Sequence, residues 1–194
     1  MPIIDEIKEK ERRVREFLHS KGLKALLLKR QANFSWMTCG GLNLVGITTE
    51  IGATSLLITE GAKFIISNNI EAPRMIDEEG LEKQGFVIKT FPWYEDQEVS
   101  VVKELVGDGS MGCDVPFQNA IMLTEEIARL RYSLTPEEQE RYRWLGERVS
   151  SALEKTLIET KKTYFTGCRS SGRLRIFSIS SSAVLNPNCL TRLH

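Results

Sequence analysis

Side chains able to bind a catalytic metal are scarce in this chain. Zinc, manganese and cobalt sites draw on histidines and carboxylates, and the 194 residues include two histidines, His19 and His194. His19 falls on the polar side of an expected helix, which predicts a solvated side chain. A terminal residue such as His194 is poorly placed to act as a fixed ligand. We therefore predict no metal ligand, no cofactor and no catalytic residue in this chain.

The motifs of nucleophilic and phosphate chemistry are missing as well. The sequence contains no G-x-S-x-G elbow, no Walker A loop and no G-x-G-x-x-G motif. The glycines at 40–41 and 107–109 are interpreted as turns. No C-x-x-C pair occurs, and we interpret all four cysteines as buried or idle thiols: Cys39, Cys113, Cys168 and Cys189.

Two polar clusters could instead serve a ligand. The first lies beside the Gly40-Gly41 turn and contains Asn33, Trp36 and Thr38. A tryptophan in this position either packs in the core or lines a cleft. The second follows an expected strand and contains Asn68, Asn69, Glu71 and Arg74. A helix cap at one asparagine and a surface ion pair three residues apart would explain this second cluster without a ligand.

Helices and strands alternate along most of the chain. An apolar stripe from Ile3 to Leu18 predicts a helix that Gly22 ends. Strands are predicted at 24–29, 53–59, 62–67, 86–91 and 110–115, with Glu60-Gly61 turning a hairpin between the second and third. Further helices are predicted at 32–38, 68–85, 96–106 and 120–131. In the helix at 96–106 we expect Val99, Val102 and Leu105 to share a face. The fold class is therefore α/β, with a mixed sheet flanked by helices.

A long helix follows these elements. Thr135-Pro136-Glu137-Glu138 is a capping box with proline at the first helical position. Apolar residues then recur every three to four positions from Tyr142 to Leu157, which predicts a helix of about 24 residues and about 36 Å. One face of it must pack on another surface. Left without one, it favours a dimer or a larger oligomer.

Charge separates a final segment from the rest. Of the 26 basic and 26 acidic residues, residues 162–194 hold five bases and no acid. We therefore predict three parts, namely a domain at 1–134, a connecting helix at 135–161 and an irregular tail at 162–194. The formal net charge of zero argues against binding nucleic acid through a basic surface. Neither a signal peptide nor a membrane-spanning stretch is evident, so we expect a cytoplasmic protein.

Three segments together resemble a known family. They are KALLLKRQANFSWMTCGG, TSLLITEGAKFIISNNIEAPRMIDEE and IARLRYSLTPEEQERYRWLGERVSSALEKTL, in this order. They are similar to the N-terminal domain and connecting helix of the creatinase, prolidase and Xaa-Pro aminopeptidase family, over about residues 5–160. The resemblance implies that a separate catalytic domain binds two divalent metals (manganese, cobalt or zinc) and cleaves peptides next to proline.

The same resemblance implies a supporting role for this chain. The N-terminal domain of such enzymes closes one side of the active-site mouth and supports dimerisation. The candidate mouth or interface residues are Trp36, Asn69 and Arg74, and peptide substrate is expected only together with a catalytic domain. The alternative is a free-standing peptide- or protein-binding module derived from the same domain. Because the family pattern ends where the acid-free segment begins, we hypothesise that residues from about 163 onward are foreign or out-of-frame sequence and that the catalytic domain is absent.

Overall fold

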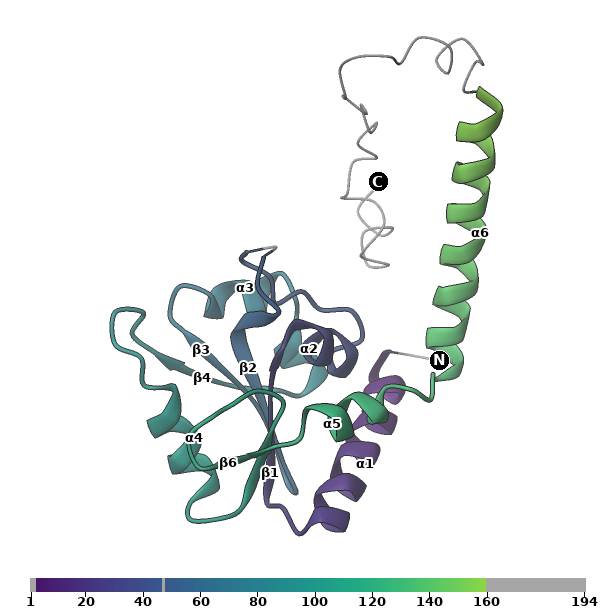
Figure 1. Cartoon of the computed structure of the whole chain (residues 1–194). Helices are drawn as coiled ribbons and strands as arrows, with labels where there is room; N and C mark the ends of the chain where they lie inside the picture. Colours follow the sequence, from purple (N-terminus) through teal and green to yellow (C-terminus); the bar gives the residue numbers. More distant parts are fainter. Residues whose placement is uncertain (1–2, 47, 160–194) are drawn as a thin grey trace, which may run out of the picture. The chain divides into compact units, whose positions relative to one another are not determined.

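The computed structural model describes residues 3–46 and 48–159 (Figure 1). The chain divides into a first unit, Met1–Ser133, and a second unit that begins at Leu134, and each is described by itself. The predictions for the tail at 162–194, including its foreign origin, concern residues outside this described part.

The first unit is built on a six-stranded sheet in the order β4-β3-β2-β1-β5-β6. The strands are β1 (Ala25–Arg30), β2 (Ile51–Thr59), β3 (Lys63–Asn68), β4 (Val87–Phe91), β5 (Met111–Cys113) and β6 (Ala120–Met122). β2 is antiparallel to both β1 and β3, whereas β3 and β4, β1 and β5, and β5 and β6 pair in parallel. The predicted mixed sheet is therefore confirmed.

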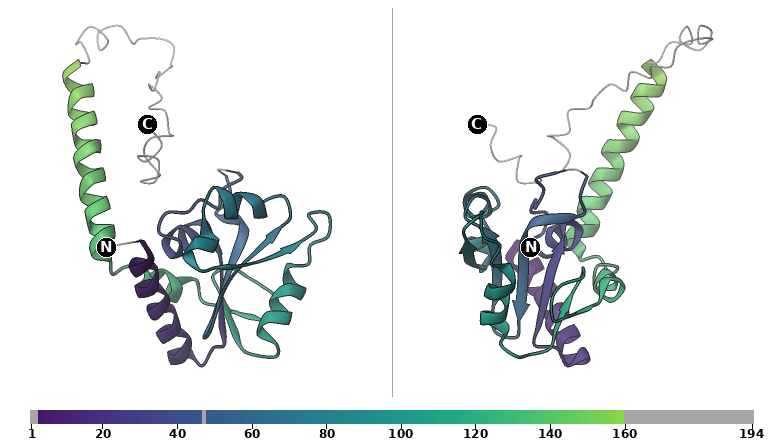
Figure 2. Two further views of the ribbon diagram at one scale, coloured as in Figure 1. Left: turned by 180° about the vertical axis from the view of Figure 1, so that it is seen from behind. Right: turned by 60° about the vertical axis from the view of Figure 1, so that its left-hand side comes forward.

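Helices cover both faces of this sheet. They are α1 (Ile3–Lys21), α2 (Gln31–Met37), α3 (Ala72–Asp77), α4 (Glu98–Val106) and α5 (Thr124–Leu130), with a short 3₁₀ helix η1 (Leu81–Gln84). Side chains alternate along β1, as a strand requires. Leu26 and Leu28 join the core formed with α1, α2, α3 and α5, whereas Ala25 and Leu27 join the core formed with α4. The right-hand view of Figure 2 shows α1 and α5 on one side of the strands and α4 on the other.

The predicted hairpin is confirmed. β2 and β3 pair from Ser55 opposite Ile66 to Ile58 opposite Lys63, and the Thr59 N–H donates to the Ala62 carbonyl at 2.8 Å across the turn. The helix before them is also confirmed, and it ends where Gly22 adopts a φ of 64°, a conformation that glycine takes without steric cost.

The single helix predicted at 68–85 is wrong. The segment forms α3 and then η1, separated at Gly80, whose φ of 63° lies in the left-handed region and stops an α-helix. Asn68 does act at the start of the segment, because its Oδ1 accepts the N–H groups of Ile70 and Glu71, each at 2.9 Å. Asn69 has another role, described below.

One further helix prediction needs correction. Ala120–Met122 begins the predicted helix at 120–131 but forms β6, because its backbone pairs with β5 in the register Met111 opposite Ala120. Sequence periodicity could not reveal this strand, since it depends on pairing with distant residues. The helix predicted at 96–106 is confirmed as α4, in which Val102 is buried and Val99 is 37% exposed.

The second unit contains α6 (Pro136–Glu159), a helix of 24 residues as predicted. Its capping box is formed, because the Thr135 N–H donates to Glu138 Oε2 at 2.8 Å and the Glu138 N–H donates to Thr135 Oγ1 at 3.2 Å. Within the part of the chain that the structure describes, no helix has both the length and the apolar character needed to cross a membrane.

Candidate functional site

The direction of the strands gathers several loops at one edge of the sheet. All strands except β2 run in the same direction, so the segments that follow β1, β3, β4 and β5 leave from the same edge. In open α/β sheets, ligands commonly bind outside the carboxyl ends of the strands. Both polar clusters found in the sequence lie on these segments, and we therefore take the carboxyl edge as the candidate site.

Asp114 organises the edge between β1 and β5. Its carboxylate is fully buried and accepts the backbone N–H groups of Lys29 and Arg30, each at 2.9 Å, and the Asn33 side-chain amide at 2.7 Å. Three N–H donors compensate a buried charge and fix the start of α2. The oxygens are thus engaged in structure, which does not favour Asp114 as a catalytic base.

Trp36 lies in the core and not on an open surface. Only 7% of it is exposed, and its ring packs with the helices on the α1 side of the sheet. Lys10 Nζ donates to the Trp36 carbonyl at 2.7 Å and lies 5.7 Å from the centre of the ring. Lys10 is in turn paired with Glu6 at 2.7 Å, with both side chains 1% exposed. The assignment of Trp36 to a substrate mouth stays a prediction.

Cys39 follows α2 and is also buried. Its φ of 58° is unusual for a residue other than glycine, and its Sγ lies 3.5 Å from Lys10 Nζ. Burial raises the pKa of the Cys39 thiol to about 12, and burial does the same for Cys113. Both cysteines are free and buried, as interpreted, and a raised pKa favours the protonated, less reactive thiol.

Asn69 connects two neighbouring loops of the edge. Its backbone N–H donates to the Phe91 carbonyl, and its Oδ1 accepts the Trp93 N–H, both at 2.9 Å. Asn69 thereby holds the segment after β4 against the end of β3. This segment presents Trp93, 63% exposed, and Tyr94, 74% exposed, with ring centres 6.0 Å apart at an angle of 85°.

Arg74 and Glu79 hold the loop that follows α2. Arg74 pairs with Glu71 at 2.8 Å, which confirms the predicted ion pair, and its Nη1 lies 3.5 Å from the Leu42 carbonyl. Glu79 Oε2 accepts the Leu42 N–H at 3.0 Å, and burial raises the pKa of this carboxyl above its usual value. The backbone N–H and carbonyl of Leu42, in the loop after α2, are therefore both contacted by side chains of α3 and the residues just after it.

The structure brings the three predicted site residues together only in part. Asn69 directly follows β3 and Arg74 lies within α3, whereas the ring of Trp36 lies against Lys10 of α1. Trp93 and Tyr94 were missed by the sequence analysis, and their signal was an aromatic pair directly after a strand, in FPWYED. His19 is exposed, as predicted for a solvated histidine, and its Nε2 lies 3.0 Å from Glu60 Oε2.

Among residues 3–46 and 48–159, no three histidine, cysteine or carboxylate side chains are grouped closely enough to hold a metal ion. The carboxyl edge holds the hydrogen bonds of Asp114, two buried thiols and an exposed aromatic pair. Asn33 Oδ1 and Trp36 Nε1 are buried there without a hydrogen-bond partner in the described part of the chain.

Solved structures share this fold. The Xaa-Pro dipeptidase from Bacillus anthracis matches over 80% of this chain and 44% of its own, with 17% identity and a TM-score of 0.61. The prolidase from Pyrococcus horikoshii OT3 matches over 79% and 43%, with 17% identity and a TM-score of 0.57. A dipeptidase from the same organism matches over 78% and 44%, with 15% identity and a TM-score of 0.58.

These matches confirm the resemblance at the level of the fold. The chain spans less than half of the length of each of these three structures. No protein-family model and no curated protein sequence matches the chain.

Proposed function

We propose that this chain serves as the non-catalytic N-terminal domain and connecting helix of an Xaa-Pro peptidase. In that role it shapes the mouth of the active site and contributes oligomer contacts in the cytoplasm. The observation that carries the proposal is the agreement in fold with Xaa-Pro dipeptidase and prolidase structures over less than half of their length. A part of that size leaves the chemistry to the remainder of such an enzyme.

The metal chemistry of such an enzyme would belong to that remainder. Two divalent metals (manganese, cobalt or zinc) would supply Lewis-acid activation of water there. Among the described residues, no three histidine, cysteine or carboxylate side chains are grouped closely enough to hold a metal ion, and the buried Asp114 already accepts three N–H donors. Peptide would then be cleaved only when a catalytic domain is joined to this chain.

The apolar face of α6 supports a connecting role. Tyr142, Val149, Leu153 and Leu157 are each more than half exposed, and Thr135 and Glu138 fix the start of the helix. A helix with a fixed start and an exposed apolar face is suited to pack between two domains or to pair with a second copy of the chain.

A chimeric enzyme tests the proposal. Residues 3–159 would replace the matching segment of the Bacillus anthracis Xaa-Pro dipeptidase, and hydrolysis of Xaa-Pro dipeptides would be measured with manganese, cobalt or zinc. We expect the chimera to hydrolyse them and the 194-residue chain alone to have neither activity nor stoichiometric metal after dialysis.

The control is the same enzyme with its matching segment deleted. If deletion and replacement give equal activity, the grafted chain has no supporting role. Turnover by the 194-residue chain alone would overturn the non-catalytic assignment outright.

One observation favours the alternative, a free-standing peptide- or protein-binding module. Trp93 and Tyr94 are exposed on a loop that Asn69 anchors, and rigid exposed aromatics are frequent anchors at interfaces. Under this alternative, Trp93→Ala abolishes binding of peptide to the isolated chain, as measured by the fluorescence of its tryptophans. Under the principal proposal, the isolated chain binds no peptide and the substitution changes only the activity of the chimera.

A further inference from the structure

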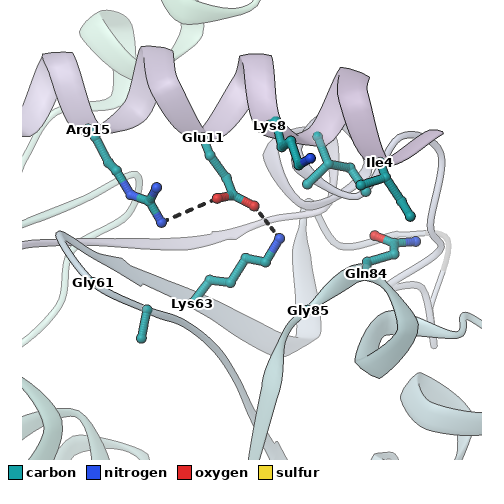
Figure 3. A pocket seen from close by; sticks show the side chains of 10 residues that line it. Ile4, Lys8, Glu11, Arg15, Gly61, Lys63, Gln84 and Gly85 are labelled. Carbon is teal, nitrogen blue, oxygen red and sulfur yellow. Dashed lines mark hydrogen bonds and ion pairs between the residues drawn. The ribbon is translucent and has the colours of Figure 1, made fainter. Parts of the chain in front are cut away.

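A cavity of about 240 Å³ opens at the end of the sheet opposite the carboxyl edge, where β3 begins (Figure 3). It lies between α1, the start of β3 and the end of η1, so all of its walls belong to the first unit. Ile4 and Ile7 supply apolar surface on the helical side. Since a water molecule occupies about 30 Å³ in the liquid, the cavity has room for several non-hydrogen atoms beyond a bare ion.

Its ionic lining is predominantly positive. Lys8, Arg15 and Lys63 line the cavity together with a single carboxylate, Glu11. Glu11 is paired with Lys63, and their side chains are 12% and 9% exposed. Glu11 pairs with both Lys63 and Arg15, and Lys8 lies 4.0 Å from Asp5, which is outside the lining. The three cations of the lining therefore outnumber its single carboxylate by two. Charges beside low-dielectric walls act on a ligand more strongly than charges in water.

Two buried polar atoms of the lining have no hydrogen-bond partner. They are Arg15 Nε, a donor, and Gln84 Oε1, an acceptor. Arg15 uses another nitrogen, Nη2, to contact Glu11 at 3.2 Å. Figure 3 shows Arg15 and Gln84 at opposite ends of the cavity. Buried polar atoms in native proteins are nearly always paired, so these two atoms are available to a molecule bound in the cavity.

We propose that this cavity binds a small organic carboxylate that carries a hydroxyl or amino group at the far end of a short aliphatic chain. The carboxylate accepts from Arg15, the hydroxyl or amino group donates to Gln84, and the aliphatic part lies against Ile4 and Ile7. A guanidinium offers paired N–H donors that suit a carboxylate. The site is distinct from the carboxyl edge and requires no catalytic domain.

Four probes test this assignment on the full 194-residue chain. They are 5-hydroxypentanoate, pentanoate, the neutral pentanamide and inorganic phosphate, each titrated at constant ionic strength. Binding is followed by the backbone N–H signals of Gly61 and Gly85, which line the cavity, in nitrogen-15 NMR spectra. We expect saturable binding of both carboxylates, tighter for the hydroxy acid, and no binding of the amide.

Matched variants separate the contributions. Arg15→Gln is expected to weaken binding of the hydroxy acid by about tenfold or more, because a charge-assisted hydrogen bond is lost. Arg12→Gln, on the exposed side of the same helix, should leave it unchanged. Gln84→Leu should remove the preference for the hydroxy acid over the plain acid.

Three results would overturn the proposal. Signals that move without saturating indicate general salt screening. Binding of the amide as tight as that of the carboxylates indicates that the cavity is only apolar. Binding of phosphate as tight as that of the carboxylates shows that the aliphatic wall has no role. If Arg15→Gln does not fold, Gln84→Glu provides the second test. Its added negative charge must weaken carboxylate binding, and unchanged affinity contradicts the site.

Discussion

Lys10 Nζ lies 2.7 Å from the backbone carbonyl oxygen of Trp36, so an ammonium group from α1 is buried against the last turn of α2. Carbonyls at a helix C-terminus carry partial negative charge and favour a nearby cation. The charge of Lys10 is balanced by Glu6, one turn earlier on α1, at 2.7 Å. The position of α2 therefore depends on an ion pair that lies wholly on another helix.

Lys10→Met is predicted to destabilise the first unit by about 3–5 kcal/mol, because it leaves the carboxylate of Glu6 buried without its cation. The free energy of unfolding would be measured by urea denaturation. Combining Lys10→Met with Glu6→Gln removes both charges and should recover part of the loss. Lys8→Met, at a side chain that is 71% exposed, should change stability by less than about 0.5 kcal/mol.

Glu9 is predicted to make the stability of α1 sensitive to acid. Hydrogen bonds from Arg12 and then Arg13 lower the pKa of Glu9 from 4.5 to about 2. A lowered folded-state pKa stabilises the protein above the unfolded pKa, and this contribution is lost as the pH falls through the folded value. Because Glu9 is 33% exposed, the effect should be below about 1 kcal/mol.

The measurement is urea denaturation of wild type and Glu9→Gln between about pH 6 and about pH 2. The stability difference between the two proteins should be largest at the upper end and should shrink as the pH is lowered. A difference that stays constant over this range would show that the carboxylate of Glu9 does not act through its charge.

Gly52→Ala is predicted to be strongly destabilising. A Cβ atom at this position would lie 1.9 Å from Asn43 Nδ2. Asn43 is buried and exchanges two hydrogen bonds with the backbone of Thr54, so it cannot move aside without breaking them. The expected cost is about 1–3 kcal/mol by thermal and urea unfolding. Gly61→Ala is the control, since a Cβ there meets no atom within 4 Å, and equal costs for the two substitutions would refute the argument.

Most of the fold could be predicted from local patterns. The hairpin at Glu60-Gly61, the stop at Gly22 and the capping box at Thr135 are set by residues within a few positions of one another. The strand at Ala120–Met122 was not predictable, because its identity depends on pairing with Met111–Cys113. The helix at 68–85 failed because Gly80 was not recognised as a left-handed stop within an otherwise helical sequence.

The candidate site was predicted less completely than the fold. Asn69 and Arg74 were selected by their residue types, but the contacts of Asn69 with Trp93 and of Arg74 with Leu42 join segments far apart in the sequence. Asp114 gave no local signal, since its three donors come from β1 and α2. Contacts across the sheet edge follow from strand order, and strand order was not predictable from this sequence.

Asn69→Ala is predicted to loosen the loop that carries Trp93 and Tyr94. The substitution removes the acceptor of the Trp93 N–H, and a loss of about 0.5–1.5 kcal/mol is typical of one such hydrogen bond. Hydrogen exchange measured by mass spectrometry should become faster at 92–95 and remain unchanged in β1. Arg74→Gln serves as the control, because its contacts are with Glu71 and Leu42. Equal protection of 92–95 in wild type and Asn69→Ala would contradict the anchoring role.

The apolar face of α6 is predicted to drive self-association of the chain. Val149, Leu153 and Leu157 are 55%, 59% and 68% exposed, and an uncovered apolar surface of this kind favours association. Sedimentation velocity should show a species larger than the monomer, and Val149→Glu combined with Leu153→Glu should shift it to the monomer. Ser150→Glu combined with Ser151→Glu adds the same charge at neighbouring positions and should leave the larger species intact. A wild-type chain that sediments as a monomer at all concentrations would refute this use of the helix, and the apolar face would then require a different partner.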